Sequence, residues 1–306
     1  MKLLVVGAGV QGKKRALVAG EDFAGFLDPE VEFAQYRSIN ELNHATYDAV
    51  AICTPTSLKE NYINYFLHQQ KHILVEKPLI CIKPEYIIEM KRKARDKKLV
   101  LYTAYNHRFE PCVVFLRDQI KGKRLGKIYS IRIFYGNGTA RLVRSSSWRD
   151  TGLGVIEDLV PHLVDTILFW LPDYSLNFSL NIASNFENAS PDHAILLSRD
   201  SEPLISLEVS LCSWKNSFVC DVIGERGSLH INGLCKWGDV EVKLRERVLP
   251  SGVPAEESIT FAAGDPTWRL EYEHFKRLVQ EGSHSADNVD LRIQKMLNEF
   301  VYPRKS

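Results

Sequence analysis

The chain has 306 residues, of which 39 are Lys or Arg and 38 are Asp or Glu, giving a formal net charge of +1. This length is enough for two domains with their own cores, or for one large domain. A charge this close to zero excludes bulk attraction to a polyanion, and we expect no nucleic-acid partner. We interpret the one basic run, residues 91–98, as the solvated outer face of a helix.

The apolar start of the chain resembles a signal peptide only superficially. It contains Gly7 and Gly9, and its basic residues follow the apolar run instead of preceding it. The next most apolar stretch, residues 162–171, is too short to span a bilayer and contains Asp165. The six cysteines form no C-x-x-C pair, so we expect reduced thiols and no metal site. The sequence therefore predicts a cytoplasmic protein with no membrane contact.

The first hundred residues alternate short apolar runs with longer amphipathic segments. Such alternation predicts a doubly wound parallel sheet, an α/β Rossmann domain over residues 1–105. The expected strands are 2–6, 23–28, 47–53, 72–76 and 99–105, and the expected helices are 10–19, 57–70 and 83–98.

Beyond residue 105 the pattern changes to alternating apolar and polar residues. Strands are expected at 128–135, 204–211, 217–224, 229–232 and 239–244, with residues 225–228 as a hairpin connection. A late helix should begin with Asp265 as N-cap and Pro266 at its first position, and end before Gly282. We therefore expect residues 106–306 to form an α+β domain with an open, mostly antiparallel sheet.

The segment "GAGVQG", residues 7–12, matches the G-x-G-x-x-G pattern in its required setting between a strand and a helix. Gly7 permits a tight turn, Gly9 lets the backbone approach a pyrophosphate, and Gly12 lets the helix pack closely. Val10 and Gln11 complete the turn, whose unpaired N–H groups would hold the diphosphate. The alternative is a glycine-rich turn without a ligand.

The second strand ends in Asp28, where a carboxylate can accept hydrogen bonds from the adenosine ribose. A 2′-phosphate would be repelled there, and by Glu30, so NAD is favoured over NADP. Because ligands bind at the carboxyl ends of parallel strands, Thr54, Pro55 and Thr56 should line the same cleft, unless they form only a strand-to-helix turn.

Residues 75–79, "VEKPL", end another buried strand, so Glu76 and Lys77 should emerge at the same edge of the sheet. Lys77 can donate a hydrogen bond to a substrate oxygen near the nicotinamide, and the Lys–Pro bond can be cis. A surface Glu–Lys pair in a loop is the equally weighted alternative.

Asp158 and His162 are four residues apart in a stretch that predicts a helix, so they share one face. Pro161 is compatible with that helix if it begins near Glu157 or Asp158, because proline is tolerated in a first turn. A histidine suits the proton transfer that accompanies hydride transfer, and a carboxylate beside it can orient the ring. The alternative is an N-cap aspartate and a half-buried histidine bonded to backbone.

Together these segments resemble the glucose–fructose oxidoreductase/inositol dehydrogenase (Gfo/Idh/MocA) family over nearly the whole chain. The resemblance also rests on "YNHRFEP" at 105–111, "SSWRD" at 146–150, "GLGVIEDLVPHLVD" at 152–165 and "VIGERGSL" at 222–229. It implies NAD-dependent oxidation or reduction of a sugar or cyclitol, and a homodimer or homotetramer formed through the C-terminal sheet. The implied catalytic set is Lys77, Asp158 and His162, and the implied substrate residues also include Asn106, Arg108, Trp148 and Arg149.

Two residues depart from that family pattern: Leu153, where the family usually has a glycine triplet, and Pro161, where it usually has a small residue. Residues 134–150 resemble members found among polysaccharide-biosynthesis enzymes, which favours an activated sugar as substrate. Arg141 and Arg144 could then contact a diphosphate, although two arginines on a loop are more often only solvated. Two alternatives remain open: an NAD-using glycosidase that oxidises its substrate transiently, and a non-catalytic NAD-binding regulatory protein.

Overall fold

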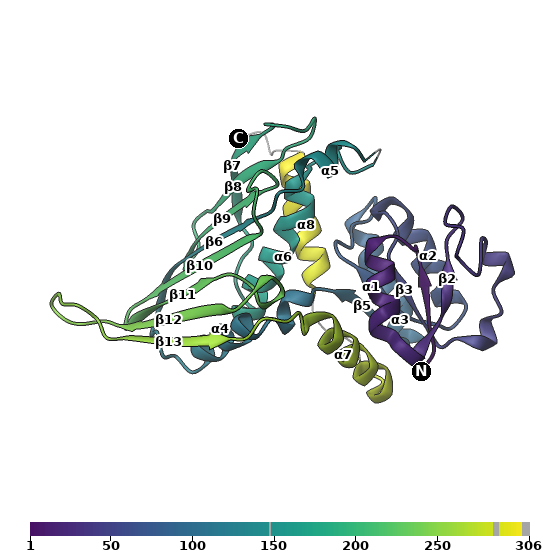
Figure 1. Cartoon of the computed structure of the whole chain (residues 1–306), viewed down its shortest axis with the longest axis horizontal. Coiled ribbons are helices and arrows are strands. Elements are labelled where there is room, and N and C mark those ends of the chain that lie inside the picture. Colours follow the sequence, from purple (N-terminus) through teal and green to yellow (C-terminus); the bar gives the residue numbers. More distant parts are fainter. Residues whose placement is uncertain (147, 284–287, 302–306) are drawn as a thin grey trace. The chain divides into compact units, whose positions relative to one another are not determined.

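The computed structural model describes residues 1–146, 148–283 and 288–301. It divides into two compact units (Figure 1). Unit 1 contains Met1–Asn106 and Trp268–Gln294, and unit 2 contains His107–Thr267 together with the described residues from Lys295 onward. The sequence pattern placed one boundary at residue 105 and did not anticipate that two later segments, residues 268–283 and 288–294, belong to unit 1.

Unit 1 is built on a five-stranded parallel sheet in the order β2-β1-β3-β4-β5. The crossovers change direction between β1 and β3, and such a switch point is where ligands bind in open α/β sheets. The doubly wound Rossmann prediction is confirmed. The strands are β1 (Leu3–Val6), β2 (Phe23–Leu27), β3 (Ala49–Ile52), β4 (His72–Glu76) and β5 (Leu101–Ala104), and the helices between them are α1 (Val10–Ala19), α2 (Thr56–His68) and α3 (Pro84–Asp96).

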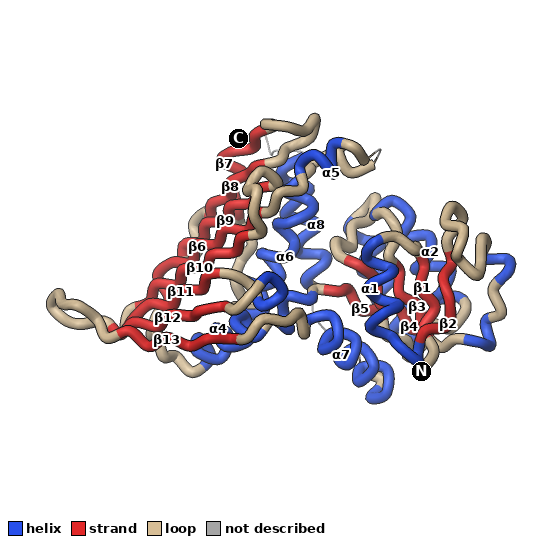
Figure 2. Tube along the Cα trace, in the orientation of Figure 1, coloured by secondary structure: helices blue, strands red, loops and turns tan. Residues whose placement is uncertain are grey.

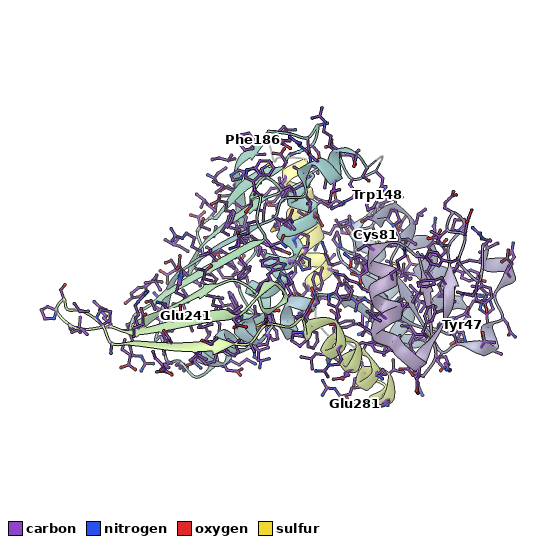
Figure 3. The ribbon with its side chains drawn as sticks, in the orientation of Figure 1. Tyr47, Cys81, Trp148, Phe186, Glu241 and Glu281 are labelled. Atoms are coloured by element: carbon purple, nitrogen blue, oxygen red, sulfur yellow. The ribbon has the colours of Figure 1, made fainter. Side chains whose placement is uncertain are left out.

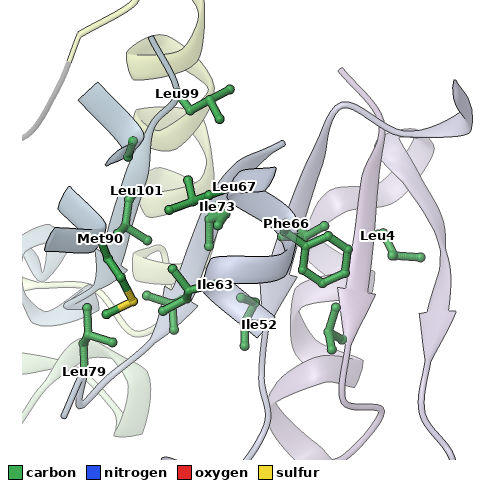
Figure 4. Packing of buried hydrophobic residues seen from close by; sticks show 14 of the residues in the cluster. Leu4, Ile52, Ile63, Phe66, Leu67, Ile73, Leu79, Met90, Leu99 and Leu101 are labelled. Atoms are coloured by element: carbon green, nitrogen blue, oxygen red, sulfur yellow. The ribbon is translucent and has the colours of Figure 1, made fainter. Parts of the chain in front are cut away.

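The central strands of unit 1 are apolar on both faces because helices cover both sides of the sheet. On one side, Ile52 and Ile73 belong to the same buried cluster as Ile63, Phe66 of α2 and Met90 of α3 (Figure 4). This packing makes the sheet a rigid base for the loops at its carboxyl edge.

A helix from the C-terminal part of unit 1 packs on the other side of the same sheet. Tyr272 and Phe275 of α7 (Thr267–Glu281) join a buried cluster with Leu3 and Tyr102, and α8 (Val289–Val301) follows. The predicted late helix is therefore present. It begins at Thr267, whose N–H and hydroxyl both donate to Asp265 Oδ1, so Pro266 precedes the helix.

Unit 2 is built on an eight-stranded sheet in the order β13-β12-β11-β10-β6-β9-β8-β7 (Figure 2). Its neighbouring strands are antiparallel except for β6 and β9, which run parallel, so the mostly antiparallel prediction is confirmed. The strands are β6 (Ile128–Gly136), β7 (Phe178–Ser184), β8 (His193–Ser198), β9 (Leu204–Ser210), β10 (Ser217–Gly224), β11 (Gly227–Asn232), β12 (Val240–Glu246) and β13 (Glu256–Phe261), and the helices are α4 (Pro111–Lys121), α5 (Ala140–Arg144) and α6 (Val155–Trp170).

The two faces of this sheet differ in chemistry. Helix α6 packs on the face formed by β6, β8 and β9, where Ile131, Ile133, Ile205, Leu207 and Val209 are buried. The opposite face carries a row of charged residues paired across neighbouring strands: Arg132, Asp221, His230 and Lys243. Period-two alternation explains both faces.

Helix α6 begins earlier than the sequence pattern predicts. Its N-cap is Gly154 and its first residue is Val155, not Glu157 or Asp158, so Pro161 lies in the second turn, inside the helix. The earlier start arises because the N–H of Val155 donates to Pro191 O at 2.7 Å. Pro161 therefore removes one helical hydrogen bond, which the burial of both Pro161 and its neighbours offsets.

Candidate active site

The turn between β1 and α1 has the geometry of a phosphate cradle. Gly7 has a φ of +93°, which disfavours any residue with a side chain. A Cβ at Gly12 would lie 1.9 Å from Gly7 O, whereas a Cβ at Gly9 would meet nothing within 4 Å. Gly9 also caps α1 without a side-chain hydrogen bond. The protein therefore leaves space and unpaired helical N–H groups where the diphosphate of a dinucleotide would bind.

Asp28 and Thr54 stand at the same switch point. Asp28 Oδ2 accepts a hydrogen bond from Ala8 N at 2.8 Å, and Oδ1 accepts from the N–H groups of Glu30 and Val31. The carboxylate is thus fixed beside the glycine turn. Among the described residues, the buried hydroxyl of Thr54 has no hydrogen-bond partner. Buried polar groups normally have a hydrogen-bond partner, so a cofactor bound at the end of β3 could supply the one that the Thr54 hydroxyl lacks.

The turn that carries Lys77 is held by two buried cations that the sequence analysis missed. Lys59 Nζ of α2 donates to Glu76 O at 2.6 Å and to Pro78 O at 2.8 Å, the carbonyls on either side of Lys77. Arg15 of α1 donates to Glu76 Oε1 at 2.6 Å. The Lys77–Pro78 bond is cis. Lys77 therefore projects from a backbone that is anchored at both neighbouring residues.

Arg15 is the centre of a buried ion-pair network. Only 2% of its surface is exposed, and it pairs with Glu76 and, at 2.7 Å, with Glu271 of α7. Burial alone would lower the pKa of Arg15, but Glu76 and Glu271 raise it above its ordinary value, so it stays charged. The sequence did contain a signal for one of these buried cations. At helical spacing Lys59 lies on the same face of α2 as the apolar residues Ile63 and Phe66. A charge on an apolar stripe points to a buried partner.

In unit 2, His162 is held on α6 with its ring against a second imidazole. The rings of His162 and His107 are stacked, with centroids 4.4 Å apart and planes at 18°. His162 is 9% exposed. Asp158, one turn earlier on the same helix, accepts a hydrogen bond from Arg149 at 3.3 Å. The predicted pair therefore lies on one helix, and Arg149 adjoins it.

Arg108 fixes the segment that carries His107. Its guanidinium donates to both carboxylate oxygens of Asp165 on α6, the shortest contact being 2.6 Å to Oδ1. Asp165 is fully buried, so this pair is a strong constraint on both segments. Asn106, the other predicted residue of this motif, is buried and belongs to unit 1.

The loop before α6 is also firmly held. Asp150 accepts hydrogen bonds from the backbone N–H groups of Ala189 and Ser190 at 3.0 and 2.8 Å. A Cβ at Gly154 would lie 2.2 Å from Pro191 O, which explains the glycine at this position. Trp148, in contrast, is 56% exposed (Figure 3). Ser147 of the same motif lies outside the described residues.

The sequence comparisons agree with this geometry. Residues 1–105 match a family model described as "Oxidoreductase family, NAD-binding Rossmann fold", and residues 113–230 match "GFO/IDH/MocA C-terminal domain". The chain belongs to the Gfo/Idh/MocA family of oxidoreductases. Its N-terminal unit is accordingly an NAD-binding Rossmann domain, which confirms the cofactor class expected from the glycine turn and Asp28.

Several curated proteins and solved structures are similar to this chain. Inositol 2-dehydrogenase of Rhizobium meliloti (strain 1021) is 28% identical over 175 residues, 57% of this chain and 50% of that protein. Levoglucosan dehydrogenase in complex with NADH has a TM-score of 0.82 at 19% identity, covering 98% of this chain and 96% of that one. UDP-N-acetylglucosamine 3-dehydrogenase GnnA from Acidithiobacillus ferrooxidans has a TM-score of 0.80 at 18% identity, covering 98% and 96%. The chain spans about half the length of the first curated relative, and the structural likenesses establish the fold alone.

Two kinds of site do not occur in the part of the chain that the structure describes. No group of three or more His, Cys, Asp or Glu residues there is arranged to hold a metal ion. Within the same residues, no helix has both the length and the apolar character needed to cross a bilayer.

Proposed function

We propose that this Gfo/Idh/MocA protein transfers hydride between NAD and a secondary hydroxyl or ketone of a sugar, nucleotide sugar or cyclitol. The observation that carries the proposal is the stacked, buried His162 on α6 of a chain that also contains an NAD-binding Rossmann domain. This class of reaction needs a group that takes or gives a proton, for which histidine is suited, and a carrier of hydride, which is NAD.

In the proposed reaction His162 is the acid/base. A bound NAD would supply the hydride acceptor for oxidation and, as NADH, the hydride donor for reduction. In the oxidation direction His162 takes the hydroxyl proton, and in reduction it donates that proton to the ketone oxygen. The role of Asp158 is to orient the imidazole and to stabilise its protonated form. The role of Lys77 is to donate a hydrogen bond to the reacting oxygen, and its anchored backbone supports that role.

For the substrate we favour a nucleotide sugar. A surface hollow of about 620 Å³ in unit 2 is lined by Arg141, Arg144, Ser145, Phe186 and Glu187. Two arginines suit a diphosphate, and an exposed aromatic ring suits stacking on a base or sugar. Arg141 Nε lies 3.5 Å from Glu187 Oε2, which is a weak ion pair at the surface. A diphosphate could take the place of the Glu187 carboxylate as the partner of Arg141.

The proposal includes two further expectations carried over from the sequence. We expect a homodimer or homotetramer formed through the unit 2 sheet, whose outer face carries the row of charged residues described above. Light scattering at several protein concentrations tests this, and a monomer throughout would contradict it. We also expect a cytoplasmic location, in keeping with six free thiols.

A substrate panel tests the proposed reaction. UDP-sugars, inositols and anhydrosugars are incubated with NAD and, as ketones where available, with NADH, and the absorbance of reduced nicotinamide is followed. We expect turnover with at least one class, a fall in kcat of about 10²–10⁴-fold in His162→Ala, and unchanged NADH affinity by fluorescence titration.

The alternatives predict different outcomes of the same experiment. Cleavage of a glycosidic bond without net NADH formation would identify a glycosidase that oxidises its substrate transiently. A protein that binds NADH, turns over none of the panel and keeps its cellular role as His162→Ala would be a regulatory NAD-binding protein.

A further inference from the structure

Unit 2 contains a lysine beside the stacked imidazoles that neither the sequence motifs nor the proposed reaction assigns. Lys236 lies on the short 3₁₀ turn Cys235–Trp237, after β11. Its Nζ is 3.3 Å from His107 Nε2 and 3.3 Å from the hydroxyl of Tyr135. His107 in turn stacks on His162. The ring of His107 therefore contacts both the ammonium of Lys236 and the ring of His162, the proposed acid/base.

The surroundings of Lys236 come from several elements. His107 and Tyr135 contact it directly, and the ring centroid of Trp237 lies 4.6 Å from its Nζ. Glu110, which accepts a hydrogen bond from Cys235 N, and Asp265 supply the nearby negative charge. Burial lowers the pKa of Lys236 to about 8, although Glu110 and Asp265 oppose that shift.

Resting on the proposed function, we propose that Lys236 is a positioning residue that acts through His107 to keep His162 unprotonated, and so ready as a base, at neutral pH. An ammonium has donors but no acceptor, so His107 Nε2 must accept and the proton of the neutral ring must reside on Nδ1. The Lys236–His107 contact thereby selects one tautomer of His107.

Two physical effects connect Lys236 to His162. A positive charge held near His107 opposes protonation of that ring, and its field also opposes a second positive charge on the adjacent His162. The uncharged His107 ring fills the space beside His162 and excludes water, which would otherwise screen the field. When the pH rises through about 8, Lys236 loses its proton and both effects disappear.

The test is a histidine titration by NMR, which requires no substrate. His162 is assigned by comparison with His162→Gln, and its titration is followed in the unaltered protein, Lys236→Met, Lys236→Arg and the control Lys243→Met. Lys243 is a suitable control because it lies on the other face of the same sheet and pairs with Glu256 at 2.9 Å.

We expect Lys236→Met to move the titration midpoint of His162 upward by on the order of one pH unit, from the loss of one charge at an effective dielectric constant of about 20. In Lys236→Arg, which keeps a positive charge at this position, the midpoint of His162 should stay close to that of the unaltered protein. In Lys243→Met the midpoint of His162 should be unchanged. An unchanged or lowered midpoint in a folded Lys236→Met would overturn the inference.

A second measurement covers the case in which Lys236→Met does not fold. In the unaltered protein the His107 resonance should change again near pH 8, when Lys236 releases its proton. Absence of that step would equally overturn the inference. Once a substrate is known, the acidic limb of kcat/KM should follow the His162 midpoint in each variant. Because the NMR result does not depend on turnover, a failed inference and a failed proposed function give different results.

Discussion

The turn around Lys77 in unit 1 and the cluster around His162 in unit 2 use buried cations in different ways. Lys59 and Arg15 bind backbone carbonyls and carboxylates at 2.6–2.8 Å, partners that stay acceptors at any pH near neutral. Lys236 instead contacts an imidazole and a phenol at 3.3 Å, and it is itself able to titrate. Lys59 and Arg15 thus form, with their partners, a fixed frame around Lys77 in unit 1, whereas the buried cation of unit 2 contacts side chains of titratable type.

The largest effect is expected from removing the centre of that frame. Arg15→Met leaves the carboxylates of Glu76 and Glu271 without their shared cation in a nearly dry site. Breaking a buried ion pair in this way costs about 3–5 kcal/mol of unfolding free energy. Denaturant titration of the NADH-free protein measures the loss.

Arg92→Met is the matched control for this substitution. Arg92 pairs with Asp96 one helical turn away, and both side chains are more than half exposed. We expect a change of at most about 0.5 kcal/mol. Equal losses in the two variants would mean that the Arg15 network does not hold the frame, and the contrast between the units would fail.

Two substitutions in the glycine turn should separate the stability of the fold from the binding of NADH. Gly12→Ala places a Cβ against Gly7 O and should lower the unfolding free energy by about 1–3 kcal/mol, because the close approach of α1 to the turn is lost. Gly9→Ala meets no protein atom within 4 Å, so it should leave stability unchanged and weaken NADH binding. Thermal unfolding and fluorescence titration measure the two effects. A Gly9→Ala protein that binds NADH normally would show that the open space is not the diphosphate site.

The same contrast explains what could be predicted from sequence. Alternating apolar runs predicted the Rossmann sheet, and contiguous motifs singled out Gly7–Gly12, Lys77 and His162 as candidate site residues, because both depend on local spacing. The partners of these residues could not be predicted in this way. Lys236 and His107 are 129 positions apart and lie on two separate short 3₁₀ turns, so no local spacing connects them; they meet only in the folded unit 2.

The start of α6 was mispredicted for a related reason. Local rules placed the helix start so that Pro161 fell in the first turn. The actual start depends on Pro191, a residue 36 positions away from Val155, whose carbonyl accepts the hydrogen bond from Val155 N. A tertiary contact therefore outweighed the local preference of a single residue.

A smaller effect is expected on the preference of unit 1 for NADH over NADPH, which we assign to the charge of Asp28. Asp28→Asn keeps an oxygen that can accept from Ala8 N but removes the negative charge that would repel a 2′-phosphate. We expect the ratio of NADPH to NADH affinity to rise about tenfold, the effect of roughly one unit charge near the surface. Glu30→Gln should change the ratio less, because Glu30 is exposed. If the unaltered protein already binds NADPH more tightly than NADH, the role assigned to Asp28 is wrong.

The smallest effect is expected at the loop that leads into α6, the helix that carries His162. Asp150 is half-buried, and the N–H groups of Ser190 and Ala189 hold its pKa below the ordinary range. A lowered folded-state pKa means that this contact is complete above the pKa of the unfolded chain and weakens as the pH falls through the folded value. Hydrogen exchange at Ala189 and Ser190 should therefore quicken, relative to the intrinsic rate, only in acid. Asp150→Asn should remove that acid dependence, since the amide keeps its oxygen but does not titrate, whereas Asp173→Asn, at an exposed position after α6, should leave it unchanged. If acid and Asp150→Asn both leave the two amides protected, the contact with Pro191, not Asp150, is what holds this loop to the start of α6.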